Sequence, residues 1–403
     1  MNLSHRIQLD PTASQREYFA RAAGTSRFVW NLALAEWNEQ YRLGGKPKAV
    51  DLKRYFNSFK YEAYPWLKGV HRDAHSQPFA NLQTAFNNYF AGRAKRPAFK
   101  KKGKSRDSFY VANDRFSVAG YRVRLPVVGY VRMTEALRFK GKLLSAVVSR
   151  EVDRWFVSIS VEMPEPAVAA PTGDPIGIDL GLTTFAALST GERVKAPKPL
   201  AASIKRLRRL QRRVSRKVKG SNNRRKANAR VAKLHYRIKN VRRDFVHKFT
   251  TRIASAHRQV CIEDLNVAGM SKNHALARAI SDVLWSETRR QLDYKCRLFG
   301  SELVVRDRFF PSSKICSECS LKADAMPLSV REWTCADCGA VHDRDSNAAT
   351  NILNGPIRAA SPEFTPREIA ALAVSNDRET AVDERGTITG QPMFAHNLDT
   401  RVS

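Results

Sequence analysis

The chain has 403 residues, of which 43% are hydrophobic, 9% aromatic and 27% charged. This length and composition are typical of a folded protein with two or three domains, and they exclude a wholly disordered chain. No stretch approaches the roughly 18 consecutive apolar residues of a membrane span, and the opening segment lacks the apolar core of a signal peptide. We therefore expect a cytoplasmic protein with no membrane partner.

The charge balance indicates a polyanionic partner. There are 70 Lys and Arg against 38 Asp and Glu, a net charge of +32. Residues 355–403 carry five Arg and seven acids, net −2, so residues 1–354 hold the remaining +34. Such a field attracts phosphate backbones through the release of counterions. We therefore expect nucleic acid as the partner, and a disordered tail at 355–403 outside the binding surface.

Apolar patterning divides the first half of the chain. Residues 1–9 alternate as a strand does, and residues 11–92 show helical spacing. Residues 92–106 hold eight Lys and Arg without an acid, which predicts a basic loop. The pattern over 109–163 is that of strands, and we expect a small β-barrel there, followed by a Pro-rich linker at 166–175.

The next segment begins with a strand, a Gly turn and a second strand from residue 176. Residues 205–250 then contain 19 Lys and Arg against one acid, and Gly220 begins a break between two helical stretches. A solvated pair of charged helices normally carries acidic partners that relieve repulsion, and these are missing. We predict a helical hairpin that lays arginines along a nucleic acid, among them Arg208, Arg209, Arg212 and Arg213. Its packing face is predicted to hold Ile204, Leu207, Leu210, Val214, Val231, Leu234, Ile238, Val241 and Phe245.

The cysteine spacing predicts a zinc site. Cys316 and Cys319 form one Cys-x-x-Cys pair, and Cys335 and Cys338 form another after fifteen residues. This is the spacing of a four-cysteine zinc ribbon, in which a closed tetrahedral site makes the single ion structural. A disulfide framework is disfavoured because nothing indicates an oxidising compartment. We expect the other two cysteines, Cys261 and Cys296, to be buried thiols.

Three acids stand in settings typical of a metal site. Asp179 lies in the strand segment IGIDLG, Glu263 follows the apolar run VCI, and Asp345 precedes a predicted helix start at Asn347. One acid on a strand is usually a turn or surface residue, but three such acids can build a joint site. Crowded carboxylates repel one another unless cations neutralise them. Mg²⁺ prefers such oxygen ligands, and two ions would support in-line displacement at a phosphodiester.

These motifs resemble those of a known family. The segments IGIDLGL, IEDL and FFPSSKICSEC…CADCGAVHDRDSNAATNI resemble the split RuvC-type nuclease domain of TnpB, an insertion-sequence protein related to the type V CRISPR effectors. RFVWNLAL (27–34), NLQTAFNNYF (81–90) and RPAFKKK (96–102) resemble that family's N-terminal half. The resemblance covers about residues 1–354. One departure is Ser320, where the family usually has Gly after the second zinc cysteine.

The resemblance implies an α/β multidomain architecture. Its parts are a β-barrel wedge domain (1–10 and 93–165), an inserted helical recognition domain (11–92), an RNase H-like (RuvC) nuclease domain (176–310 and 342–354) and an inserted zinc ribbon (311–341). It implies a guide RNA from the transposon end, one protein per guide RNA, and cleavage of matching double-stranded DNA beside a short motif. It gives Asp179, Glu263 and Asp345 the catalytic, magnesium-binding roles, with Asp179 bridging two ions.

The resemblance also suggests nucleic-acid contacts. By rough alignment, the flanking DNA motif would be contacted by Arg72, Ser76, Gln77 and Asn113, although ordinary phosphate or surface roles are the alternative. Lys100, Lys101 and Lys102, with the hairpin arginines, would grip RNA and heteroduplex backbones without reading sequence.

Other functions remain open at this point. A guided DNA-binding repressor of the same lineage would have lost catalytic acids, yet all three are present. A DNA recombinase without a guide would stay active after RNase treatment. A zinc-ribbon RNA-binding protein without enzymatic activity would leave the three acids unexplained.

Overall fold

The computed structural model describes residues 1–164, 169–324, 326–327 and 329–355. The predicted tail, apart from Gly355, and residues 166–168 of the predicted linker lie outside the described residues. The elements of the N-terminal part are β1 (Asn2–Asp10), α1 (Ala13–Arg42), α2 (Ala49–Ala63), η1 (Pro65–Gly69), α3 (Arg72–Phe90), β2 (Ser108–Ala112), η2 (Asn113–Arg115), β3 (Ser117–Ala119), β4 (Arg122–Leu125), β5 (Gly129–Met133), β6 (Lys142–Glu151) and β7 (Arg154–Glu162).

The C-terminal part contains both helices and strands. Its elements are β8 (Ile176–Leu180), β9 (Ala186–Leu188), β10 (Arg193–Val194), α4 (Pro199–Ser215), α5 (Asn222–Ala256), β11 (Gln259–Glu263), α6 (Val267–Met270), α7 (His274–Val283), α8 (Trp285–Phe299), β12 (Glu302–Arg306), η3 (Ser312–Lys314), β13 (Glu332–Thr334), β14 (Val341–Asp343) and α9 (Arg344–Asn354). The predicted first strand, N-terminal helices, basic loop and strand-rich region are all confirmed at the level of secondary structure.

The N-terminal sheet is antiparallel, with strand order β2-β6-β7-β1-β5-β4-β3. Strand β1 alternates buried and exposed residues, as one face of the sheet packs on a core and the other meets solvent. Val111 of β2 and Val123 of β4 belong to the same core although their strands stand far apart in the sheet. Within the described residues no pairing joins β2 to β3, so closure into a barrel stays a prediction.

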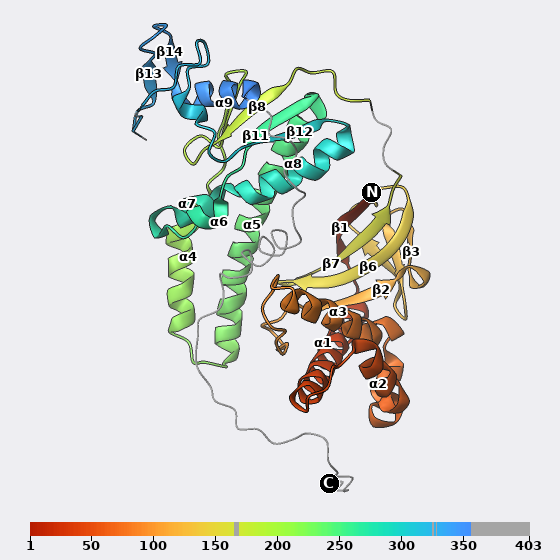
Figure 1. Cartoon of the computed structure of the whole chain (residues 1–403). Helices are drawn as coiled ribbons and strands as arrows, with labels where there is room; N and C mark the ends of the chain where they lie inside the picture. The colour runs from red at the N-terminus through yellow and green to blue at the C-terminus, as the bar shows by residue number, and fades with distance from the viewer. Residues whose placement is uncertain (165–168, 325, 328, 356–403) are drawn as a thin grey trace.

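Helix α1 belongs to two cores. Thr12 caps its start, because its side chain accepts from the Gln15 N–H while the Gln15 side chain accepts from the Thr12 N–H. The first turns pack on the sheet through residues such as Phe19, and the later turns pack on α2 and α3 through Leu34 and Trp37. The long helix therefore joins the sheet to the helical region (Figure 1).

The second sheet has the order β10-β9-β8-β11-β12, in which β8, β11 and β12 run parallel. The three consecutive buried residues in each of its central strands, β8 and β11, are apolar, as is typical of strands covered on both faces. Val260 and Ile262 share a core with α5 and α8, whereas Cys261, between them, shares a second core with Ile352 of α9. Helix α9 therefore covers the face opposite α5 and α8.

Helices α4 and α5 form the predicted hairpin, which lies beside the N-terminal part in Figure 1. Leu207 and Leu234 are among the residues of its core. Val241, predicted on the packing face, is instead 38% exposed, because the shorter α4 does not extend along the whole of α5. Cys261 and Cys296 are buried as predicted.

Candidate active site and cysteine cluster

Asp179 and Glu263 end two neighbouring parallel strands. In the register of β8 and β11, Ile178 lies opposite Ile262, and each acid is the next residue of its strand. The carboxyl ends of parallel strands meet at one edge of a sheet, where α/β proteins place ligands. The fold therefore brings together two acids that are 84 positions apart in the sequence.

A glycine lets α9 deliver the third acid to this edge. A Cβ atom added to Gly177 would lie only 2.0 Å from the carbonyl oxygen of Ala349, so α9 rests directly on the backbone of β8. Asp345 lies one helical turn before Ala349, and Asp179 lies two residues beyond Gly177. Asp343 caps this helix, since its Oδ1 accepts the Ser346 N–H at 2.9 Å.

Burial and neighbouring negative charge both act on the acids at this edge. Burial raises the pKa of Asp179 to about 7, and the negative charges of Glu263 and Asp345 add to the shift. Burial also raises the pKa of Glu263 to about 7, with a further contribution from Asp264. Glu263 and Asp345 are thus near enough for their charges to act on Asp179, although the three carboxyl groups are not gathered within 4.8 Å of one another as the cysteine sulfurs are. A buried carboxylate beside further carboxylates is a setting that favours a bound cation.

Several basic residues around the acids were not identified from the sequence. Arg331 Nη1 lies 3.4 Å from Asp345 Oδ1, and the charges of Arg344 and Arg331 oppose the rise in the Asp179 pKa. Asp264 is held by Arg289 and by Arg308 at 2.7 Å. The only signal in the sequence was that some of these arginines stand near the acidic motifs along the chain. In so basic a chain, such neighbours are common and not informative.

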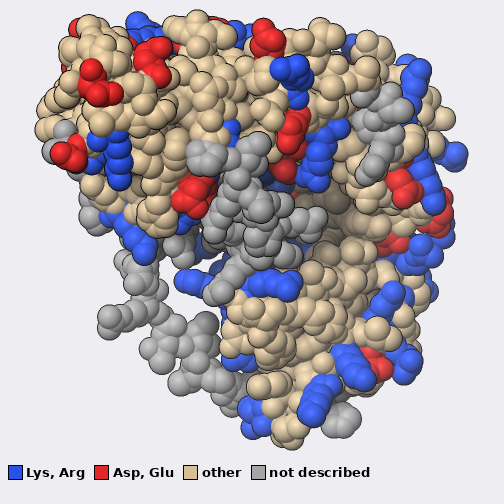
Figure 2. Space-filling view, turned by 45° about the horizontal axis from the view of Figure 1, so that its top comes forward, with Lys and Arg blue, Asp and Glu red and all other residues tan. Residues whose placement is uncertain are grey.

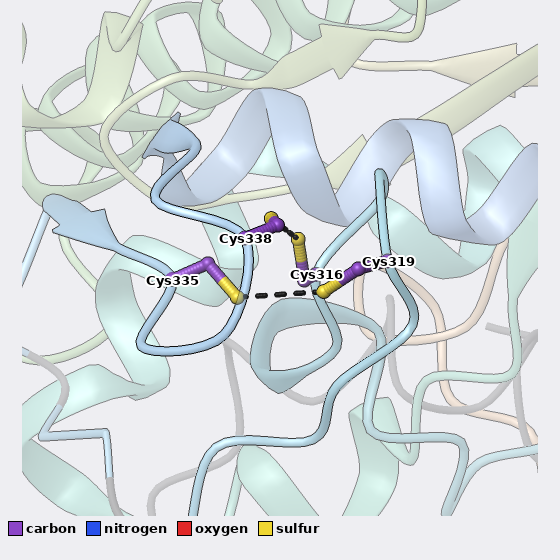
Figure 3. A group of neighbouring side chains, drawn as sticks. All are labelled: Cys316, Cys319, Cys335 and Cys338. Atoms are coloured by element: carbon purple, nitrogen blue, oxygen red, sulfur yellow. Dashed lines mark hydrogen bonds between the residues drawn. The ribbon is translucent and has the colours of Figure 1, made fainter.

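The four predicted zinc cysteines lie together. Their sulfur atoms are all within 4.8 Å of one another, and Figure 3 shows the four side chains grouped together, with Cys316 beside Cys338 and Cys319 facing Cys335. The Cys316–Cys338 and Cys319–Cys335 sulfur distances are 3.6 and 3.5 Å, close to the about 3.8 Å edge of a tetrahedron with zinc–sulfur bonds of about 2.3 Å. Among the described His, Cys, Asp and Glu residues, this is the group gathered closely enough to hold one metal ion.

The two Cys-x-x-Cys turns have matching backbones. Ser320 N–H donates to Cys316 O at 3.0 Å, and Gly339 N–H donates to Cys335 O at 3.0 Å. Both donors have left-handed backbones, with φ of +65° at Ser320 and +73° at Gly339. Ser320 therefore occupies a conformation that favours glycine, so the departure from the family pattern carries backbone strain.

Hydrogen bonds from backbone and side chains surround the sulfurs. The N–H groups of Cys338 and Asp337 donate to the Cys335 sulfur and lower its pKa to about 7, which favours the metal-binding thiolate. The buried His342 places Nε2 3.0 Å from Cys316 Sγ. His342 belongs to β14, which pairs with β13, so the predicted domain boundary at 341/342 falls within a strand of the cysteine region.

Two asparagines of α9 fasten the helix to the cysteine region, a role that was not predicted from the sequence. Asn347 Oδ1 accepts the Ser317 N–H at 2.9 Å while its Nδ2 donates to Ile315 O at 2.7 Å. Asn351, one turn later, donates to Ser312 O at 2.8 Å. Their spacing of four residues on a helix was the available signal. The helix that carries Asp345 is thus bonded to the cysteine turns.

The N-terminal candidates for DNA contact partly converge. Arg72 and Asn113 are brought near one another because Asp73 Oδ2 accepts the Ala112 N–H at 2.9 Å, joining the start of α3 to the end of β2. Arg72 is 55% exposed, while Ser76 and Gln77 follow on α3 and are half-buried. All four residues therefore belong to one junction of α3 and β2.

The basic candidates differ in accessibility. Arg208, Arg209, Arg212 and Arg213 of α4 are exposed, as are Lys101 and Lys102. Lys100 instead packs its Nζ 3.8 Å from the centre of the Trp30 ring, and burial lowers its pKa to about 8. Figure 2 shows Lys and Arg spread over the visible face, with several bordering its central hollow.

No helix in the described part of the chain is long and apolar enough to cross a membrane.

Three family profiles match the chain: "Probable transposase" (OrfB_IS605) at residues 158–274, "Cas12f1-like, TNB domain" at 285–352 and "Helix-turn-helix domain" at 1–46. In this structure residues 1–46 contain β1 and the single helix α1, not two short helices.

Curated relatives match over most of their length. A Streptomyces pristinaespiralis protein named "Putative RNA-guided DNA endonuclease" is 42% identical over 397 residues, which is 96% of this chain and 95% of the relative. Escherichia coli "Putative RNA-guided DNA endonuclease InsQ" is 33% identical over 368 residues, covering 86% and 90%.

A solved structure supports the fold. The cryo-EM structure of a Cas12f1–sgRNA–target DNA complex matches with a TM-score of 0.54 at 15% identity, covering 86% of this chain and 84% of that one. Together with the relatives, this agreement confirms the resemblance found in the sequence. The chain belongs to the TnpB (OrfB_IS605) family and has a Cas12f-like α/β fold.

Proposed function

We propose that the protein is an RNA-guided, Mg²⁺-dependent DNA endonuclease that cleaves guide-matched DNA beside a short flanking motif. The names of its relatives support the class of reaction. The observation that carries the proposal is the convergence of Asp179, Glu263 and Asp345 at one edge of the β8–β11 pair, where burial and the charges of Glu263 and Asp345 raise the pKa of Asp179. We assign these residues to a single RuvC-like site.

The three acids fit a magnesium site by their chemistry. Carboxylate oxygens are preferred ligands of Mg²⁺. Burial, together with neighbouring negative charge, raises the pKa of Asp179 and Glu263, and cations would neutralise that charge. We propose that the acids hold two ions, with Asp179 between Glu263 and Asp345. When bound, such ions would supply an activated water and stabilise the leaving oxygen in phosphodiester hydrolysis. The four cysteines fit one structural zinc ion, which would fix the segment bonded to α9.

The remaining assignments follow from this function. We propose the domain division implied by the family resemblance, with one guide RNA from the transposon end per protein and double-stranded DNA as target. The exposed arginines of α4 would hold nucleic-acid backbones, and the junction of α3 and β2 would contact the flanking motif.

The test is an acid-to-amide change in protein purified with the RNA from its native flanking DNA. Asp179→Asn should retain binding of RNA and matched DNA but lose cleavage to background, because the amide cannot supply the negative charge. Asp174→Asn, an exposed acid before β8, is the matched control and should cleave as the wild type does.

Three outcomes would contradict the proposal. Cleavage by Asp179→Asn at the wild-type rate would place the site elsewhere. Guided binding without cleavage by the wild type would indicate a repressor. Cleavage that persists after stringent RNase treatment would indicate a recombinase without a guide.

A further inference from the structure

Four aromatic rings from α1 and α3 form a series that runs from the interior of the helical region to its surface. The buried Trp37 and Phe86 stack with ring centroids 4.3 Å apart and 7° between their planes. Phe86 stacks on Phe90 at 5.9 Å and 26°, and Phe90 lies 6.5 Å from Tyr41. Phe90 and Tyr41 are 59% and 53% exposed, so the series ends at solvent.

The series follows from helical spacing and ends in a wider apolar patch. Trp37 and Tyr41 are four residues apart on α1, as are Phe86 and Phe90 on α3, so each pair lies on one helix face. The Tyr89 ring, 38% exposed, lies 5.3 Å from the Phe90 ring, and Leu43, two residues after Tyr41, is 70% exposed. We call Tyr41, Leu43, Tyr89 and Phe90 the aromatic end surface. Contiguous apolar patches of this kind on folded proteins often mark interaction sites.

Exposed cations follow both helices that carry the aromatic end surface. Lys46 and Lys48 follow α1, and Arg93 and Lys95 follow α3; all four are exposed. The second loop folds back on its helix, since the Arg93 N–H donates to Asn88 O at 2.8 Å. No acid occurs in residues 43–50 or 91–106, and no ion pair within the described residues involves these four cations.

We propose that the aromatic end surface binds unpaired bases of a single-stranded nucleic acid, whose phosphates lie against Lys46, Lys48, Arg93 and Lys95. The exposed end of an aromatic stack offers a π-face on which a base can continue the series, and stacked aromatics beside cations are the typical surface for single strands. The uncompensated positive charge favours a polyanion and disfavours a second copy of a chain whose net charge is +32. This inference rests on the proposed function and adds a binding site to it.

The experiment measures the affinity of the full chain, freed of copurified RNA by a high-salt wash, for fluorescein-labelled oligouridylate, oligothymidylate and a DNA duplex. Phe90→Ala and Tyr41→Ala should each weaken single-strand binding by roughly 5- to 150-fold, the value of one stacked base, while duplex binding is unchanged. Phe90→Trp should restore binding, whereas Phe90→Leu should not, because it keeps apolar bulk without a π-face. The paired change Lys46→Ala and Arg93→Ala should lower the salt dependence, by about 0.7 in slope per lost phosphate contact.

Tyr121→Ala is the matched control. Tyr121 is 62% exposed beside Arg122 on the N-terminal sheet and stacks on no ring within the described residues, so its loss should leave the affinity unchanged. If Phe90→Ala and Tyr41→Ala lose only oligouridylate binding, the bound strand is RNA. If they lose only oligothymidylate binding, the bound strand is DNA.

The outcomes separate this inference from the proposed function. The inference, but not the proposed function, would be overturned if wild type, Phe90→Ala and Tyr121→Ala bound the single strands equally well. Equal losses of single-strand affinity in the two variants would overturn it too. A wild type that binds no nucleic acid would overturn the proposed function as well. A wild-type dimer that Phe90→Ala converts to a monomer, with unchanged affinity for the strands, would show a protein interface instead.

Discussion

The two large sheets place polar chemistry in different ways. In the N-terminal sheet, β1 alternates buried and exposed residues, so its polar side chains lie on the solvent-facing side of the sheet. In the second sheet, the central strands are covered on both faces, and Asp179 and Glu263 appear only where β8 and β11 end. The alternating sheet presents a broad surface, whereas the covered sheet concentrates charge at one edge, where burial raises the pKa of both acids to about 7.

This difference also sets how much each region depends on its neighbours. The edge of the second sheet needs α9 to supply Asp345, and α9 is held by the asparagine bonds to the cysteine turns and by the close approach at Gly177. The N-terminal sheet needs no such partner for its exposed side chains. Substitutions that disturb α9 should therefore damage the acid site far more than substitutions of similar size elsewhere.

Loss of a zinc ligand should have the largest effect. Cys335→Ser should lower zinc affinity by more than the roughly 10- to 100-fold expected from losing an outer partner such as His342, and cleavage should fall because α9 loses its anchor. Zinc content and cleavage rate of the purified protein are the measurements. Cys296→Ala, a buried thiol away from the cluster, should keep its zinc. Full zinc content in Cys335→Ser would disprove the four-sulfur site.

Gly177→Ala tests the contact between β8 and α9. The added methyl group would lie 2.0 Å from Ala349 O, and a backbone atom cannot rotate away, so we expect the free energy of unfolding to fall by about 1–3 kcal/mol, with an accompanying loss of cleavage. Gly24→Ala is the control, because the nearest heavy atom to its new methyl group is the flexible end of Arg27 at 3.7 Å. Urea unfolding measures the change in the free energy of unfolding, and a cleavage assay measures the change in activity. Unchanged cleavage in Gly177→Ala would show that α9 can shift without moving Asp345.

Glu151→Gln tests the junction between the N-terminal sheet and the α4–α5 hairpin. Glu151 accepts from Arg6 at 2.6 Å and from Lys239 at 2.8 Å, and these bonds hold its pKa below the ordinary 4.5 although burial opposes ionisation. The variant should be less stable than wild type by about 1–3 kcal/mol near neutral pH. Since the folded pKa is the lower one, this difference is complete above about pH 4.5 and disappears as the pH falls through the folded value.

The control for this junction is Glu162→Gln. Glu162 is 53% exposed and lies 3.9 Å from Lys142, so its loss should change the unfolding free energy little at any pH. Equal effects of the two substitutions in urea titrations would mean that the bonds of Glu151 to Arg6 and Lys239 add nothing specific to stability.

The smallest expected effect is a gain in stability. Ser320→Gly should raise the free energy of unfolding of the zinc-loaded protein by about 1 kcal/mol, because glycine adopts φ of +65° without the Cβ penalty. Gly339→Ser, the reverse change at the matching position of the other turn, should lower it by a similar amount. Thermal unfolding measures both. A lower free energy of unfolding in Ser320→Gly than in the wild type would show that the Ser320 side chain compensates for its backbone strain.

The sequence alone predicted the strands of the N-terminal sheet, the first strands of the second sheet, the helical hairpin, the buried thiols Cys261 and Cys296, and the four gathered cysteines. These features depend on local spacing: period two for strands, the helical repeat for α4 and α5, and paired cysteines within each turn. The family resemblance followed from the same short motifs and was confirmed by relatives that match nearly the whole chain.

Only the tertiary structure decided how the pieces of the site are held together. It showed that Gly177 is needed for contact with α9, that Asn347 and Asn351 hold the cysteine turns, and that buried Arg306 donates to the last carbonyls of α9 at Ile352 and Leu353. It also showed Lys100 against Trp30 instead of free in solvent. Each of these contacts joins segments distant in sequence, and a pattern of neighbouring residues does not encode which distant backbone atom a side chain will meet.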